Sequence, residues 1–133
     1  MTKDELQAIC NKIPYFRFLN FTIETADPDS VTTTMPFADR HIGNPEAENY
    51  HGGIVASLLE ATASLSVSDD WETQPPKPIN LTVDYMRPAR SGTLNAKATI
   101  SRKGRRMASV ATVAWQDNED KPVAKGLFHF LLV

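Results

Sequence analysis

NYHGGIVASLLEATASLSV, residues 49–67, decides the fold, because it contains the one long helix that the sequence predicts. On a wheel of about 100° per residue, the large apolar side chains of residues 52–68 lie opposite Glu60, and small residues surround it. Glu60 is also the only Asp, Glu, Lys or Arg between residues 49 and 68. A lone acid among small residues indicates close approach by a strand, a second subunit or a ligand. A solvent-exposed stripe is the simpler alternative.

The triplet His51-Gly52-Gly53 comes directly before this helix. Glycines let the backbone approach a ligand, and the first N–H groups of a helix lack partners at the positive end of the helix dipole. Such a terminus can bind an anion or the oxygen of a carbonyl that gains charge in a transition state. Glycines also begin helices for backbone reasons alone, so the triplet by itself is a weak signal.

Gly52 and Glu60 are too far apart to act on one small group within one chain. They are separated by 8 positions, which is about 12 Å along a helix at about 1.5 Å per residue. A carboxylate must come within about 3 Å of the group that it serves. If both residues act on one substrate, they come from different subunits of a two-fold dimer with two composite sites.

The other segments predict an α+β domain that spans residues 1–133. Residues 3–13 have a helical pattern that ends at Pro14, and residues 21–25 and 31–37 flank turn residues as in a hairpin. Residues 38–50 are typical of a loop. Four strands follow, around residues 79–85, 94–100, 107–116 and 122–132, and we expect them to form a meander. The long helix would then cover one face of an antiparallel sheet.

Composition narrows the class of protein. Net charge is −2, but residues 1–76 carry 4 basic and 12 acidic residues, whereas residues 77–133 carry 10 and 4. The basic excess suits a small polyanionic ligand; the acidic chain as a whole and the lack of a binding motif argue against nucleic acid. Cys10 is the only cysteine, and it is expected to be a buried structural thiol. No signal peptide, membrane span or metal-ligand spacing is present, so a cytoplasmic protein without a metal is expected.

Three stretches together resemble the hotdog-fold acyl-CoA thioesterases of the phenylacetate-degradation type, in the 4-hydroxybenzoyl-CoA thioesterase superfamily. They are HGGIVASLLEATASLSV, INLTVDYMRPARSGTLNAKATI and KGRRMASVATVAWQDNEDKPVAKGLFHFLLV, and the likeness covers roughly residues 16–133. The resemblance implies a long central helix wrapped by a curved antiparallel sheet of about five or six strands, after a short N-terminal helix. It also implies a homodimer or a dimer of dimers. Its members hydrolyse acyl-CoA without a cofactor, since CoA is part of the substrate.

The same resemblance assigns catalytic roles. Glu60 falls on the catalytic carboxylate, as nucleophile or as general base to water, and Gly52 falls on the residue whose N–H polarises the thioester carbonyl. His51 orients that motif, and Ser64 matches a hydroxyl position near the carboxylate. Asn44 matches a loop residue that places the carbonyl or the water, with Asn49 as a rival because the loop is one residue longer here. Burial among small residues is expected to raise the pKa of Glu60.

The basic region matches the positions where the family meets the CoA phosphates: Arg87, Arg90, Lys103, Arg105 and Arg106. Arginine suits a phosphate through its forked donors, although each of these residues could instead be only a solubilising charge. Two other functions compete with hydrolysis of acyl-CoA. One is a non-catalytic acyl-CoA-binding hotdog protein, which the retained acid at position 60 disfavours. The other is an enoyl-CoA hydratase, for which the helix lacks the usual Asp and His pair.

Overall fold

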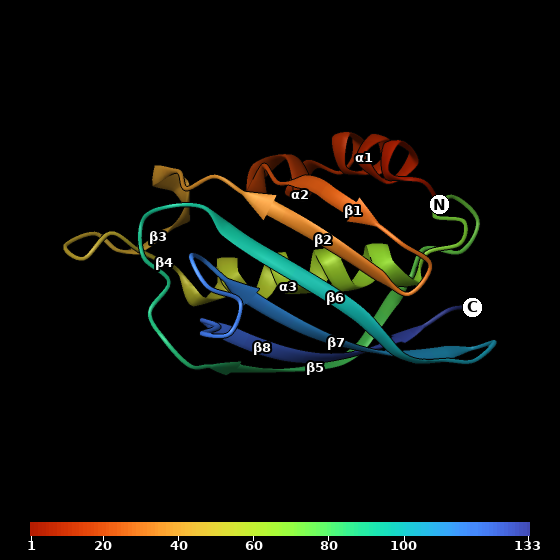
Figure 1. The fold of residues 1–133 in the computed structure, drawn as a ribbon. Coiled ribbons are helices and arrows are strands. Elements are labelled where there is room, and N and C mark those ends of the chain that lie inside the picture. The colour runs from red at the N-terminus through yellow and green to blue at the C-terminus, as the bar shows by residue number, and fades with distance from the viewer.

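The computed structural model describes all of residues 1–133 and shows one six-stranded antiparallel sheet curved around a long helix (Figure 1). Two short helices lie beside the first two strands, and a small two-stranded hairpin precedes the long helix. The elements are α1 (Lys3–Lys12), α2 (Pro14–Leu19), β1 (Thr22–Ala26), β2 (Ser30–Met35), η1 (Asp39–His41), β3 (Ile42–Asn44), β4 (Asn49–Tyr50), α3 (Gly52–Val67), β5 (Lys77–Tyr85), β6 (Leu94–Lys103), β7 (Met107–Trp115) and β8 (Ala124–Leu131). This is the hotdog fold that the resemblance implied.

The strand order corrects the expected four-strand meander. The sheet runs β1-β2-β6-β7-β8-β5, so only β6, β7 and β8 form a meander. β5 pairs with β8 and lies at the far edge of the sheet, and β2 occupies the edge of β6 that a meander would have given to β5. The alternating pattern of β5 fits either neighbour equally well. The choice between them therefore depends on contacts between segments that are distant in the sequence.

Local sequence signals explain the helix boundaries. α1 begins with a capping box, in which Thr2 and Glu5 each accept a hydrogen bond from the other's backbone N–H. Pro14 ends α1, as expected, but it also begins α2, which the sequence did not predict. Proline suits the first position of a helix because its missing N–H would have no partner there. Residues 38–50, expected to be a loop, contain η1 and the β3–β4 hairpin.

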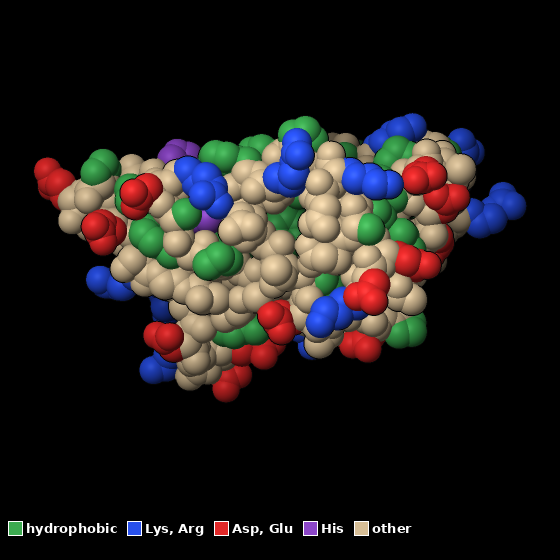
Figure 2. All heavy atoms as spheres, turned by 90° about the horizontal axis from the view of Figure 1, so that it is seen from above, with side chains coloured by type: hydrophobic (Ala, Val, Ile, Leu, Met, Phe, Trp, Pro, Cys, Tyr) green, Lys and Arg blue, Asp and Glu red, His purple; other side chains and the backbone are tan.

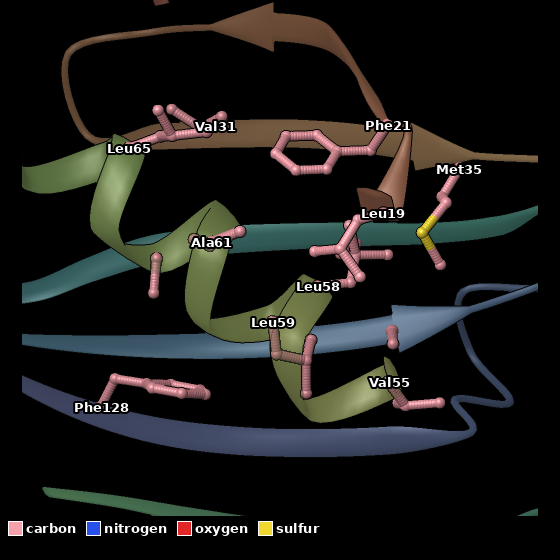
Figure 3. Packing of buried hydrophobic residues seen from close by; sticks show 14 of the residues in the cluster. Leu19, Phe21, Val31, Met35, Val55, Leu58, Leu59, Ala61, Leu65 and Phe128 are labelled. Carbon is pink, nitrogen blue, oxygen red and sulfur yellow. The ribbon is translucent and has the colours of Figure 1, made fainter. Parts of the chain in front are cut away.

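Small side chains on the sheet let α3 pack closely against it. Ala96 and Ala98 of β6 and Ala108 and Ala114 of β7 are at most 2% exposed. Against this surface α3 buries Leu58, Leu59 and Leu65, and Val31 of β2 lies beside Leu65 (Figure 3). Ala63, Ser64 and Val67, on the side of α3 nearer to Glu60, are also buried. Glu60 therefore belongs to a narrow, partly exposed strip of a helix that is otherwise enclosed.

The two edges of the sheet differ in how they are protected. At the β1 edge, the Gln7 side chain of α1 accepts a hydrogen bond from the Ile23 N–H (3.0 Å), and the α1 helix covers the strand. At the β5 edge, the nine-residue strand pairs with β8 on one side only, its outer edge has no partner strand, and Ile79, Leu81 and Tyr85 are 44–57% exposed. A long apolar edge strand is a template for pairing with another chain.

Candidate active site

His51 fixes the entrance to α3. It is the N-cap residue, and its Nδ1 accepts a hydrogen bond from the Gly53 N–H (2.9 Å), so the ring proton is carried on Nε2. The His51 N–H donates to the His41 carbonyl (2.8 Å). Gly43 makes this contact possible, because a Cβ at position 43 would lie 2.6 Å from the His51 Cα. The His51 ring thus satisfies the N–H of Gly53, the second helical residue, and fixes the first turn of the helix.

The Gly52 N–H is the group that this arrangement leaves for a ligand. Gly52 is the first residue of α3, so its N–H lies outside the hydrogen-bond ladder of the helix and at the positive end of the dipole. Tyr85, at the end of β5, donates a hydrogen bond from its hydroxyl to the Gly52 carbonyl (2.8 Å). Both residues line a cavity of about 350 Å³ with Val55, Met86 and Ala89. The cavity is mainly apolar and opens beside β5.

The structure separates the two candidate asparagines. Asn44 is exposed at the end of β3, where its Oδ1 accepts hydrogen bonds from the N–H groups of Glu46 and Ala47. Asn49, in β4, lines the cavity that contains Gly52, and its buried Oδ1 has no hydrogen-bond partner. An unpaired buried carbonyl oxygen costs free energy unless a ligand or water satisfies it. This geometry favours Asn49 over Asn44 as the residue near the Gly52 cavity.

Glu60 lies in a second, smaller cavity of about 80 Å³, lined by Tyr15 and Phe16 of α2 and by Ser57, Ala61 and Ser64 of α3. The Glu60 side chain is half-buried, and burial raises the pKa of its carboxyl group, as expected. No other cause contributes to this shift. The Ser64 hydroxyl donates to the Ala61 carbonyl (2.8 Å), so only its oxygen lone pairs face the cavity.

The two half-sites are therefore distinct within one subunit. Gly52 and Glu60 line different cavities, about two turns apart on α3. Their separation agrees with the distance argument from the sequence, and a composite site stays a prediction.

The five basic residues expected to bind CoA do not gather at one place in the subunit. Arg87 lines the Gly52 cavity and donates to the Pro122 carbonyl (2.8 Å), and the Arg90 backbone pairs with Gln116 at the end of β7. Lys103, Arg105 and Arg106 lie at the β6–β7 turn, at the opposite end of β6. The strand has 10 residues and spans about 30 Å.

The five basic residues also do not form one uniformly positive surface. Lys103 is paired with Asp69 (2.9 Å). On the face that carries α1 and α2, basic and acidic side chains are mixed, without one dominant patch (Figure 2). No surface of a single subunit therefore presents all five cations to one CoA molecule.

Sequence reasoning missed three polar residues near the half-sites. Tyr85 lies in the stretch INLTVDYMRPARSGTLNAKATI that carries part of the resemblance, but its bond to Gly52 depends on where β5 pairs. Tyr15 and Ser57 share a hydrogen bond (2.9 Å) across the Glu60 cavity. Tyr15 had no sequence signal, because α2 itself was not predicted.

The antiparallel sheet curved around the long α3 helix defines a hotdog protein. Residues 43–131 match the family described as the acyl-CoA thioesterase N-terminal domain, and the chain belongs to this hotdog thioesterase family. It is a thioester hydrolase. No helix is both long enough and apolar enough to cross a membrane.

Individual relatives agree with this family. A putative esterase of Halobacterium salinarum is 31% identical over 113 residues, which cover 77% of this chain and 72% of the relative. The medium/long-chain acyl-CoA thioesterase YigI of Escherichia coli is 25% identical over 90% of this chain and 86% of its own. The fold is shared with the zebrafish thioesterase superfamily member 2, which superposes with a TM-score of 0.85 at 20% identity and covers 100% of this chain and 99% of that one.

Proposed function

We propose that the protein hydrolyses acyl-CoA to a free acid and CoA at two composite sites of a homodimer. In each site, the Gly52 N–H of one subunit binds the thioester carbonyl oxygen, and Glu60 of the partner subunit acts as general base to water or as nucleophile. The observation that carries this proposal is the placement of Gly52 and Glu60 in two separate cavities along α3, one beside β5 and the other beside α2. Neither cavity alone contains both a carbonyl-binding group and a base.

The free edge of β5 supports the dimer. Antiparallel pairing of β5 with its own copy would continue the sheet and cover Ile79 and Leu81, which are about half exposed in the single chain. Leu81 pairs with the buried Phe128 of β8, so both side chains lie on the face of the sheet that carries α3. The two α3 helices would thus approach each other across this face. The two-fold axis would make them antiparallel and set Gly52 of one opposite Glu60 of the other.

The same two-fold symmetry would bring together basic residues that lie at opposite ends of β6 in one subunit. Arg87 follows Tyr85 at one end of β5, whereas Arg105 and Arg106 lie at the end of the sheet that contains Lys77. In an antiparallel β5 pair, the Lys77 end of one subunit adjoins the Tyr85 end of the other. The partner's β6–β7 turn would then lie at the same end of the joined sheet as Arg87 and Arg90. The phosphates of one CoA would be shared between subunits.

The chemistry needs few groups. The carbonyl oxygen gains charge when the thioester is attacked, and the helix dipole and the Gly52 N–H stabilise that charge. The raised pKa of Glu60 makes its carboxylate a better proton acceptor near neutral pH than an ordinary carboxylate. The His51 ring accepts a hydrogen bond from the Gly53 N–H, and the Tyr85 hydroxyl of β5 donates one to the Gly52 carbonyl. These two bonds fix the orientation of the Gly52 N–H.

A thiol-release assay with acetyl-, octanoyl-, palmitoyl- and benzoyl-CoA tests this function and identifies the acyl group. The relative from E. coli is named for medium and long chains, so we expect octanoyl- and palmitoyl-CoA to be the better substrates. Glu60→Gln keeps the shape of the side chain but removes the base, and should lower kcat at least about 100-fold. Unchanged turnover in this variant, or no thiol release by the native protein with any of the four esters, would reject the proposal.

A further inference from the structure

The Glu60 cavity contains a hydrogen-bond chain that begins outside the matched family segment. Tyr15, in α2, precedes residues 43–131, yet its hydroxyl lies 2.9 Å from the Ser57 Oγ inside the cavity that Glu60 lines. Ser57 is one turn before Glu60 on the same strip of α3. The Tyr15 ring stacks on Phe18, with 5.8 Å between centroids, which holds the phenol in place.

The direction of each hydrogen bond follows from counting protons. The Ser57 hydroxyl donates its single proton to the Gly53 carbonyl (2.7 Å), so Tyr15 must be the donor in the bond between the two hydroxyls. The Ser64 hydroxyl likewise donates its hydrogen bond to the Ala61 carbonyl. Every polar oxygen that faces the cavity therefore offers lone pairs only: the Glu60 carboxylate and the hydroxyl oxygens of Tyr15, Ser57 and Ser64.

This set of acceptors dictates the orientation of a water molecule. A cavity of about 80 Å³ has room for at least one, since a water occupies about 30 Å³ in the liquid. Such a water would donate one proton to Glu60 and the other to a hydroxyl oxygen, and its lone pairs would point away from both. A donor in the cavity would instead occupy a lone pair and weaken the water as a nucleophile.

We propose that Tyr15 is a positioning residue for the hydrolytic water, acting through Ser57. By donating to Ser57, Tyr15 keeps that hydroxyl turned toward Gly53, so that Ser57 and Glu60 both accept protons from the water. Glu60 takes one water proton while the water oxygen forms a bond to the thioester carbon. The tetrahedral intermediate then breaks its C–S bond, and the leaving sulfur takes that proton to give CoA and the free acid. The inference rests on the proposed function, and it favours Glu60 as general base over nucleophile.

Tyr15→Phe tests this role, because it removes one oxygen and keeps the ring that stacks on Phe18. We expect kcat for the best acyl-CoA substrate to fall roughly 3- to 10-fold, the effect of about one hydrogen bond, with KM unchanged. Ser57→Ala should lower kcat at least as much. The double variant should be no slower than Ser57→Ala alone, because Tyr15 acts through Ser57.

Ser66→Ala is the matched control. Ser66 makes the same kind of bond on α3, to the Ala63 carbonyl (2.6 Å), but it lines a different cavity at the far end of the helix. This variant should keep the native kcat, and all variants should keep the native melting temperature to within a few degrees.

If Glu60→Gln lowers turnover as expected, any one of three results would overturn the inference. Tyr15→Phe could show native kcat and KM, or it could raise KM without lowering kcat. The third result is a double variant in which the kcat losses of Tyr15→Phe and Ser57→Ala multiply. A native protein without thioesterase activity would instead refute the proposed function.

Discussion

The most decisive prediction concerns complementation between two inactive variants. Gly52→Pro removes the N–H that we assign to the carbonyl, with little expected damage to the fold. Proline is favoured at the first helical position, and His51 has φ −62° and ψ 135°, the extended conformation that suits a residue before proline. Gly52→Ala, which keeps the N–H, is the control; its Cβ would touch the Tyr85 ring at 3.4 Å. Gly52→Pro should lower kcat about 100- to 1,000-fold.

The magnitude of the rescue follows from the geometry of the site. Gly52 and Glu60 are about 12 Å apart along α3, so each composite site takes one of them from each subunit. In a heterodimer of Gly52→Pro and Glu60→Gln chains, one site has both defects and the other has none. Heterodimers purified through two different tags should therefore show about half of the native activity. A mixture with free exchange contains about half heterodimers and should show about one quarter.

The assay is thiol release from the best acyl-CoA substrate, with each variant alone as the baseline. If Gly52 and Glu60 of the same chain formed the site, every site in the heterodimer would lack one group. Activity would then stay at the level of the single variants. Purified heterodimers without rescue would thus refute the composite site, even if both variants prove essential.

Three further predictions concern the dimer, the charge of Glu60 and the core. Leu81→Lys should produce monomers in sedimentation velocity and a parallel loss of turnover; Leu127→Lys, at an equally exposed position on the opposite face of the sheet, should leave the dimer intact. Burial raises the pKa of Glu60 above its usual 4.5, so the folded state favours the proton, and stability is lost as pH rises through the folded-state pKa. Glu60→Gln should therefore melt at a higher temperature than the native protein at pH 8, with the difference vanishing near pH 4; equal midpoints at pH 8 would contradict this. Leu58→Ala, at a fully buried position, should cost about 2–5 kcal/mol and lower the melting temperature by about 10 °C; a shift under about 3 °C would contradict the close packing of α3 on the sheet.

Local patterns in the sequence predicted most of the elements correctly. The long helix was expected over residues 52–68 and is observed at Gly52–Val67, and Cys10 is buried as expected. Period-2 alternation and turn residues located the strands, because a strand with one buried face must alternate apolar and polar side chains. α2 was missed since six residues carry too little periodicity, and Pro14 was interpreted only as an end.

The sequence proposed only some of the residues that line the two cavities. The resemblance assigned Glu60, Gly52, His51 and Ser64, and their relative positions followed from helix spacing because they lie on one continuous helix and its cap; their roles stay predictions. Asn49 could not be separated from Asn44, since the two differ only in how the β3–β4 hairpin folds. Tyr15 and Tyr85 reach the site from α2 and β5, and no local rule connects those segments to α3.

The sequence by itself determined the helix, its lone acid, its glycine terminus and the distance that divides them, because a helix has a fixed rise per residue. Only the tertiary structure decided that β5 pairs with β8. This pairing leaves the apolar outer edge of β5 free and places the Tyr85 hydroxyl within hydrogen-bond distance of the Gly52 carbonyl. It also decided that the basic residues lie at opposite ends of β6 and that α2 adds a phenol to the Glu60 cavity. These features depend on which distant segments pack together, and burial and strand pairing across the whole chain settle that choice.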